Sequence, residues 1–123
     1  MVLIESNTKR RKAIATALRS AGIAVIAVER IAELERWPAG DVVVTESSSF
    51  TPLWKEVGAT HVVVLADSAT LGSEACGHGA SAWVPRMCAP SVVLSMLQTL
   101  SIWQPSISFT SGRAKVAEVT DAP

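Results

Sequence analysis

Four charged residues each closely follow a short apolar run of the sequence. They are the residues best suited to carry out chemistry: Glu5, Glu46, Asp67 and Arg86. Clustered carboxylates can hold a hard cation such as Mg²⁺, whereas an arginine beside a carboxylate forms an ion pair. Either chemistry requires that these residues meet in space. The elements that carry them therefore decide whether a site exists.

Five apolar runs predict β-strands that are buried on both faces, because the runs are continuous rather than alternating. They cover residues 2–4, 23–28, 42–45, 62–65 and 82–84. Glu46 ends the third strand, Ala66-Asp67 follows the fourth and Arg86 follows the fifth. In an open parallel sheet, ligands bind at the carboxyl ends of the strands. The charged residues are therefore expected at one edge.

Helical patterns separate these strands. Residues 9–21 carry apolar side chains at three- and four-residue steps, with Asn7 or Thr8 as the cap and Gly22 as the stop. Shorter helices are predicted over 31–37, over 53–57 and from Ser68 or Thr70 to Cys76, and a last helix over 90–103. The alternation predicts an α/β fold: a doubly wound, five-stranded parallel sheet of flavodoxin-like topology with right-handed crossovers.

The 123 residues suffice for one hydrophobic core, and we expect a single domain over residues 1–103. Residues 104–123 lose periodicity and gain Pro, Ser, Thr and Gly, which is typical of a linker or a flexible C-terminal tail. Such a tail could join a neighbouring domain.

Eleven basic and eleven acidic residues leave no net charge, which argues against a dedicated nucleic-acid binder. The run Lys9-Arg10-Arg11-Lys12 could contact phosphate or nucleic acid, but in a neutral protein it is more often a solvated helix face. No apolar run approaches the roughly 20 residues of a membrane span. Two cysteines and no signal-like segment favour a reduced, cytoplasmic protein.

Four segments, in chain order, resemble the strand-end signatures of response-regulator receiver domains, the CheY-like superfamily: VLIESN…RR, DVVVTE, VVVLAD and GASAWVPR. The resemblance covers residues 1–103 and implies the strand order 2-1-3-4-5. In such domains an acidic pair after strand one and an aspartate after strand three hold Mg²⁺, and the aspartate attacks a phosphoryl donor. A hydroxyl residue after strand four and a lysine after strand five hold the phosphoryl oxygens.

Four of these five positions depart from the family pattern. Glu5 matches the first acid, but the other four are replaced: Ser6 for the second acid, Glu46 for the acceptor aspartate, Ala66 for the hydroxyl residue and Arg86 for the lysine. We therefore expect a degenerate phosphoacceptor site with no catalytic residue and no cofactor, and at most weak Mg²⁺ binding through Glu5 and Glu46. The planar guanidinium of Arg86 suits a carboxylate bidentately, and we expect it to pair with Glu46.

Trp83 stands at the position of the aromatic residue that changes rotamer when receiver domains switch, and we expect its bulky indole to be fixed in one state. The resemblance implies a non-catalytic pseudo-receiver of a two-component or phosphorelay system. It would act through contacts with a signalling protein, with an adjacent domain of the same polypeptide, or with a second copy through the last strand and helix. Binding to nucleic acid or membrane is not expected.

Two other functions stay open on the sequence alone. The chain could be a receiver that still accepts a phosphoryl group on Asp67, or that binds Mg²⁺ through Glu5 and Glu46. It could also be a flavodoxin-like small-ligand-binding protein or an enzyme unrelated to signalling.

Overall fold

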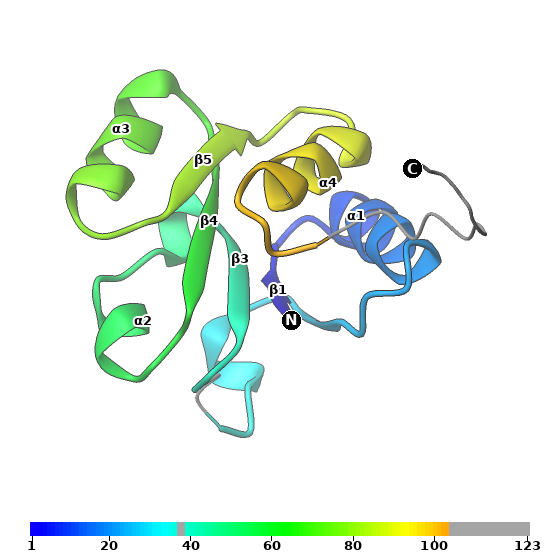
Figure 1. Cartoon of the computed structure of the whole chain (residues 1–123), viewed down its shortest axis with the longest axis horizontal. Coiled ribbons are helices and arrows are strands. Elements are labelled where there is room, and N and C mark those ends of the chain that lie inside the picture. The colour runs from blue at the N-terminus through cyan, green and yellow to red at the C-terminus, as the bar shows by residue number, and fades with distance from the viewer. Residues whose placement is uncertain (37–38, 104–123) are drawn as a thin grey trace, which may run out of the picture.

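The computed structural model describes residues 1–36 and 39–103. Its sheet contains five parallel strands: β1 (Val2–Ile4), β2 (Ile26–Val28), β3 (Val42–Glu46), β4 (His61–Ala66) and β5 (Ala82–Pro85). The strand order is β2-β1-β3-β4-β5 (Figure 1), which confirms the predicted fold class and order.

Helices cover both faces of the sheet. α1 (Thr8–Ser20) and α4 (Pro90–Thr99) lie side by side on one face, and α2 (Leu53–Glu56) and α3 (Ala69–Gly77) lie on the other (Figure 1). Two short 3₁₀ helices, η1 (Ile31–Glu33) and η2 (Ser47–Ser49), follow β2 and β3. The side chains of Asn7 and Ser68 cap α1 and α3, each by accepting a hydrogen bond from a backbone amide.

The side chains of β1 alternate between two cores, because successive residues of a strand point to opposite faces. Leu3 packs with residues of α1 and α4, whereas its neighbours Val2 and Ile4 pack with Trp54 of α2. Leu3, Ile4 and Trp54 have no exposed surface. Burial on both faces explains why the apolar runs of the sequence are continuous.

Strand β2 is shorter than the predicted strand over residues 23–28. Its pairing starts where Ile26 lies opposite Val2, the first residue of β1. The amide of Ile23 instead donates a hydrogen bond to the carbonyl of Leu18, so the first half of the run closes the end of α1. The shortness of β1 therefore limits the length of its neighbour.

The last helix ends at Thr99 rather than at residue 103. Ser101 adopts a positive φ of 59°, and the amide of Ile102 turns back to the carbonyl of Leu97. The indole of Trp103 then donates to a backbone carbonyl at the end of α1. The chain beyond α4 is thus attached to α1 instead of continuing the helix.

The predicted helix over 31–37 is reduced to η1 among the described residues. Residue 37 and the predicted tail over 104–123 lie outside them, so the domain boundary after residue 103 stays a prediction. Within residues 1–36 and 39–103, no helix is long and apolar enough to cross a membrane.

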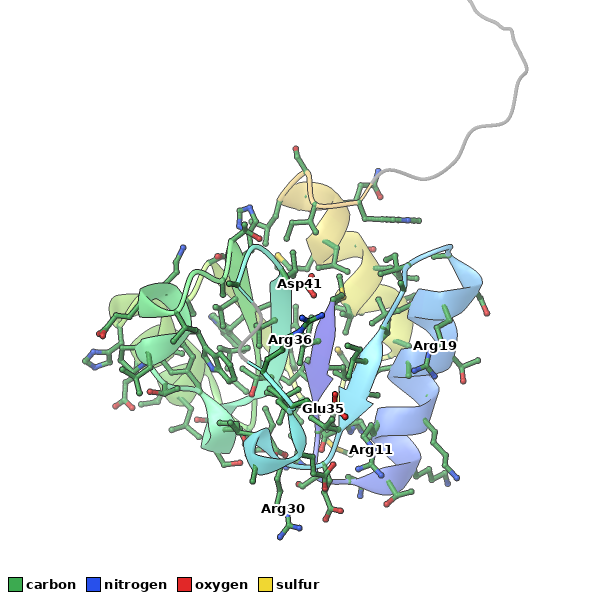
Figure 2. The ribbon with its side chains drawn as sticks, turned by 90° about the horizontal axis from the view of Figure 1, so that it is seen from below. Arg11, Arg19, Arg30, Glu35, Arg36 and Asp41 are labelled. Carbon is green, nitrogen blue, oxygen red and sulfur yellow. The ribbon has the colours of Figure 1, made fainter. Side chains whose placement is uncertain are left out.

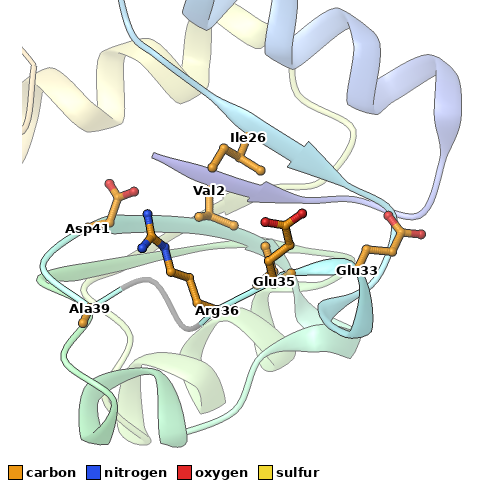
Figure 3. Close-up of a pocket in the computed structure, with 8 residues that line it drawn as sticks. Val2, Ile26, Glu33, Glu35, Arg36, Ala39 and Asp41 are labelled. Atoms are coloured by element: carbon orange, nitrogen blue, oxygen red, sulfur yellow. The ribbon is translucent and has the colours of Figure 1, made fainter.

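A hollow of about 1000 Å³ opens at the amino-terminal ends of the strands. Its wall includes Val2 of β1, Ile26 of β2, and the side chains of Arg36 and Asp41 (Figure 3). Figure 2 shows Arg36 and Asp41 beside β1 from below. Because this hollow lies at the opposite end of the sheet from Glu5, Glu46 and Arg86, it is separate from the cluster of charged strand ends.

Helix α3 approaches β5 closely at one glycine. A Cβ atom at Gly72 would overlap the indole ring of Trp83, which fills the space between the helix and the strand. The partly buried indole also packs against the core on this side of the sheet. The Trp83 ring therefore packs directly against the backbone of α3 at Gly72.

The substitution Gly72→Ala should lower the free energy of unfolding by about 1–3 kcal/mol, because the new methyl group must displace the Trp83 ring. Urea unfolding followed by circular dichroism measures the loss. Gly77→Ala is the matched control: this glycine lies in the same helix, no atom beyond its chain neighbours and the nearby helix backbone lies within 4 Å of its Cβ position, and alanine is the better helix former. Equal stability of the two variants would contradict the close packing.

Candidate functional site

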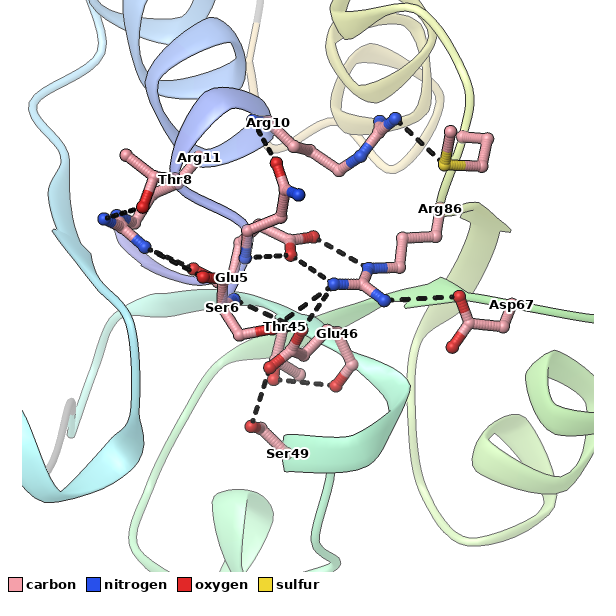
Figure 4. Close-up of polar contacts among 12 residues, drawn as sticks. Glu5, Ser6, Thr8, Arg10, Arg11, Thr45, Glu46, Ser49, Asp67 and Arg86 are labelled. Carbon is pink, nitrogen blue, oxygen red and sulfur yellow. Dashed lines mark hydrogen bonds and ion pairs between the residues drawn. The ribbon is translucent and has the colours of Figure 1, made fainter.

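The polar residues at the carboxyl ends of the strands form one cluster (Figure 4). Glu5 and Ser6 follow β1, Glu46 ends β3, Asp67 follows β4 and Arg86 follows β5. The register of the parallel pairs brings these four ends level at one edge of the sheet. The structure therefore brings together five of the residues that sequence reasoning singled out.

A buried ion pair forms the centre of this cluster. Glu5 has 0% of its surface exposed, and Arg86 contacts both of its carboxylate oxygens. Nε of Arg86 donates to Oε1 over 3.1 Å, and Nη2 donates to Oε2 over 2.6 Å. The amide of Asn7 adds a hydrogen bond of 2.9 Å to Oε2. Bidentate, charge-assisted contacts of this kind are strong hydrogen bonds in proteins.

Glu46 is the second buried carboxylate, with 4% exposure. Its Oε1 atom accepts hydrogen bonds from Nη2 of Arg86 at 3.0 Å, from the Ser6 hydroxyl at 2.8 Å and from the Ser6 amide at 3.2 Å. The Ser49 hydroxyl of η2 lies 3.4 Å from Oε2. Donors from three separate segments of the chain thus hold this carboxylate.

The predicted ion pair between Arg86 and Glu46 is confirmed, but the prediction that the contact is bidentate is wrong. Arg86 directs two of its nitrogens at Glu5 and gives Glu46 a single hydrogen bond. The two donors of Ser6 provide the reason, because they hold Oε1 of Glu46 toward the end of β1. Arg86 is therefore shared by two acids, with Glu5 as the main partner.

The residues at the end of β4 contribute less. Oδ1 of Asp67 lies 3.4 Å from Nη1 of Arg86, and the Asp67 side chain is 53% exposed. Exposed ion pairs contribute little to stability. The carbonyl of Ala66 accepts the amide of Arg86 at 2.8 Å, which is a backbone contact, and its methyl side chain offers no donor. Asp67 is thus a peripheral member of the cluster.

The ion pair shifts the pKa of both partners. Burial by itself raises the pKa of the Glu5 carboxyl, but the hydrogen bonds from Arg86 and Asn7, with the charge of Arg86, outweigh it and lower the pKa below its ordinary value. The hydrogen bond to Glu5 raises the pKa of Arg86, while burial acts in the opposite direction. Both groups are therefore charged at neutral pH.

Sequence reasoning singled out Ser6 as a site position but did not predict that it donates to Glu46, and it missed Ser49 and Arg11 altogether. Ser6 and Ser49 donate to Glu46, and the side chain of Arg11 donates to the Glu5 carbonyl over 2.8 Å. The strand order contains the signal for Ser6, because β1 and β3 are neighbours and Ser6 must then stand beside Glu46. No such signal exists for Arg11, which reaches back from α1 to the loop before it.

The arrangement is an internal ion-pair cluster, in which one guanidinium serves two buried carboxylates. Among the residues that the structure describes, no three side chains of His, Cys, Asp or Glu are placed to hold a metal ion together. Glu5 and Glu46 both direct a carboxylate oxygen at Arg86. In this geometry the positive charge of Arg86 partly neutralises the negative charge of the two buried carboxylates.

Arg86→Ala should lower the free energy of unfolding by about 3–5 kcal/mol, because it leaves two buried carboxylates without their cation. Urea unfolding at pH 7 measures this loss. Arg30→Ala is the control, since its ion pair with Glu33 spans 4.0 Å between exposed side chains and should contribute nothing measurable. If Arg86→Ala lowered the free energy of unfolding as little as Arg30→Ala, the buried ion pair would not contribute to the stability of the fold.

The lowered pKa of Glu5 predicts a dependence of stability on pH. A carboxyl with a lower pKa in the folded state stabilises the fold above its unfolded value, near 4.5, and this contribution disappears as the pH falls through the folded value. Wild type should therefore exceed Glu5→Gln in stability by a constant amount near neutral pH, and the difference should shrink below about pH 4.5.

Urea midpoints of wild type and Glu5→Gln, measured from pH 7 to pH 3, test this expectation. Glu74→Gln, at an exposed residue of α3, is the control and should follow wild type throughout. A difference between wild type and Glu5→Gln that stays constant down to pH 3 would show that Glu5 is not the group that titrates.

Comparisons with known proteins agree with this geometry at the level of the fold. No protein-family model matches the chain, and no curated protein sequence matches it significantly. The receiver domain of the Francisella response regulator 1452 is 17% identical, with a TM-score of 0.63 over 80% of this chain and 93% of that one. A structure described as an atypical orphan response regulator protein is 18% identical, with a TM-score of 0.66 over 85% and 97% of the two chains. The BeF3-activated N-terminal receiver domain of Klebsiella pneumoniae RstA is 19% identical, with a TM-score of 0.63 over 80% and 94%. The chain therefore has the fold of response-regulator receiver domains.

Proposed function

We propose that the chain is a non-catalytic signalling module of the two-component type, in which a receiver fold acts through protein contacts instead of aspartyl phosphorylation. One observation supports this most directly. The carboxylate at the acceptor position, Glu46, is buried and already engaged by Arg86 and Ser6.

A phosphoacceptor must direct a free carboxylate oxygen at the incoming phosphoryl group, in line with the leaving group. Oε1 of Glu46 accepts three hydrogen bonds, one of them from the guanidinium of Arg86. An attack by Oε1 first requires that the contact with Arg86 break, and an attack by Oε2 requires that its 3.4 Å contact with the Ser49 hydroxyl open. Ala66 also provides no hydroxyl to hold a phosphoryl oxygen.

We propose further that the module works without a bound metal or other cofactor. Mg²⁺ prefers an octahedral set of oxygen ligands, to which proteins contribute one or two carboxylates. Here Glu5 and Glu46 direct oxygens at Arg86, and Ser6 stands where a second acid would complete the ligand set. The cation that balances the buried carboxylates is Arg86.

One of the similar structures is described as an atypical orphan response regulator with a new phosphorylation-independent regulatory mechanism. That description concerns the other protein. It is consistent with a receiver fold that regulates a partner while its phosphorylation site stays unused.

The partner is proposed to be a cytoplasmic signalling protein or an adjacent domain of the same polypeptide. β5 is an edge strand of the sheet, and two exposed apolar side chains lie in the segment that follows it: Met87 at 80% in the loop and Val92 at 39% in α4. Exposed apolar surface is typical of sites that bind other proteins. The surface of β5 and α4 is therefore also the proposed contact between two copies, if the chain forms a homodimer.

Incubation of the chain with acetyl phosphate and Mg²⁺, followed by intact-mass spectrometry, tests this function. No mass gain is expected, whereas a typical receiver domain treated in parallel should gain one phosphoryl group. The variant Ser6→Asp/Glu46→Asp/Ala66→Thr/Arg86→Lys restores the family pattern, and a mass gain in this variant alone would assign the difference to these four positions.

A mass gain in the wild-type chain would overturn the proposal. If Asp67→Asn then abolished that gain, Asp67 would be the acceptor and the chain would be an active receiver with a displaced site. If Glu46→Gln abolished it, the ion pair would open far enough for chemistry.

A further inference from the structure

The hollow of about 1000 Å³ at the amino-terminal ends of the strands lies where the sheet is covered by loop instead of by an α-helix. None of its described lining residues belongs to an α-helix. α1 contacts β1 and β2 on one face of the sheet, whereas α2 and α3 contact β4 and β5 on the other. Doubly wound folds normally cover both faces with helices. The hollow thus stands where the predicted helix over 31–37, reduced here to η1, would cover the start of β2.

The hollow contains an apolar side chain that the fold leaves in water. Ile26, the first residue of β2, lines it and is 61% exposed (Figure 3). It is the only large apolar side chain of the described strands that is exposed to this degree. Val2, its partner in the register, and Leu34 line the same hollow. Because removal of apolar surface from water is favourable, the centre of the hollow favours an apolar occupant.

The edge of β2 beside the hollow is poorly suited to bind an added strand. Nη2 of Arg19 donates to the carbonyl of Val25, just before β2, over 2.8 Å. The amide of Glu29, just after β2, donates to the carboxylate of Glu33 over 3.0 Å. Side chains that occupy a sheet edge in this way hinder its pairing with another strand. A segment that docks here therefore contributes side chains to the hollow and no backbone ladder.

The C-terminal segment of the chain begins close to this hollow. The indole of Trp103 donates to the carbonyl of Ala21 over 3.2 Å, at the end of α1. Trp103 and Val25 pack against the same core cluster, and Val25 directly precedes Ile26. Residues 104–123 lie outside the described residues, but an extended chain spans up to about 3.3 Å per residue, so a few residues suffice to reach the hollow. A tether this short gives an effective concentration on the order of millimolar, at which a weak contact is occupied.

The sequence of this segment contains a matching apolar motif. Residues 106–110 read Ser-Ile-Ser-Phe-Thr, in which Ile107 and Phe109 alternate with small polar residues. A spacing of two residues places both apolar side chains on one side of an extended segment. Such a segment can direct Ile107 and Phe109 at the hollow and its hydroxyl groups at solvent.

Charges on the rim of the hollow match those that follow the motif. Glu35 and Arg36 line the hollow, are exposed, and form no ion pair with any residue that the structure describes. Further along the C-terminal segment stand Arg113, Lys115 and Glu118. Both the rim and the segment thus offer charges of both signs, and complementary pairs of this kind favour one register of docking.

We infer that residues 106–110 dock in the hollow, with Ile107 and Phe109 against Ile26 and Leu34. The occupant is thus a segment of the chain itself. The inference goes beyond the proposed function, since it requires neither a phosphorylation site nor a signalling partner. Any partner that used this end of the sheet would first have to displace the segment.

Nuclear magnetic resonance on the full, ¹³C,¹⁵N-labelled chain tests the inference. Nuclear Overhauser effects are expected between the ring protons of Phe109 and the methyl groups of Ile26 and Leu34. The ¹⁵N heteronuclear Overhauser values of amides 106–110 should resemble those of the sheet, because a docked segment loses its fast motion.

Two pairs of variants separate docking from a general effect on the fold. Phe109→Ser should release the segment and shift the amide signals of residues 26 and 33–35, whereas Val119→Ser, in the same segment, should leave them unchanged. Ile26→Lys should also release the segment, and it should fold, since this side chain is 61% exposed. Leu53→Lys is its control, at a 48% exposed residue of α2, and should leave the segment docked.

Amides 106–110 that move as fast as the last residues of the chain would overturn the inference. So would release of the segment by Val119→Ser or Leu53→Lys to the same extent as by Phe109→Ser and Ile26→Lys. A mixture of labelled and unlabelled chains shows whether the contact forms between molecules. A contact that forms only between molecules would assign the hollow to a second copy and reject docking within one chain.

Discussion

The buried carboxylate of Glu5 is the constraint on which the rest of the site depends. An ionised group without exposed surface is tolerated in a protein only where a cation and hydrogen-bond donors replace water. Arg86 supplies the cation from 81 residues further along the chain. The two meet because the strand order brings the ends of β1, β3, β4 and β5 to one edge. The fold thus creates the ion pair, and the ion pair makes the burial of Glu5 tolerable.

An arginine meets this constraint in a way that a lysine does not. Nε and Nη2 of Arg86 contact Glu5, and Nη2 also contacts Glu46, so one planar group serves two acids. A lysine ammonium is a compact charge on a single nitrogen. Two carboxylates beside one guanidinium leave a surplus of negative charge, which the neutral donors of Ser6 and Asn7 stabilise. The hydroxyl and amide of Ser6 are therefore matched to an edge of the sheet at which one guanidinium serves two acids.

Much of the fold could be predicted, because continuous apolar runs and their polar ends are local features of the sequence. Those ends also predicted the contact between Arg86 and Glu46, since opposite charges at one edge of a sheet attract. The preference of Arg86 for Glu5 could not be predicted, because it depends on where Ser6 directs its donors after the edge has assembled. The shortened β2 has a similar origin, since its length is limited by its partner β1.

The proposed signalling without phosphorylation requires a physical connection between a partner surface and the rest of the fold. The start of α1 is hydrogen-bonded to two loops at the site, because Arg11 donates to the carbonyl of Glu5 and Arg10 to that of Cys88. One of these loops contains Glu5, and the other follows Arg86, the partner of Glu5 in the central ion pair. A ligand shifts an equilibrium only through contacts that differ between states. Under the proposed function, a partner that drew Arg10 away from the β5–α4 loop would create such a difference without any covalent modification.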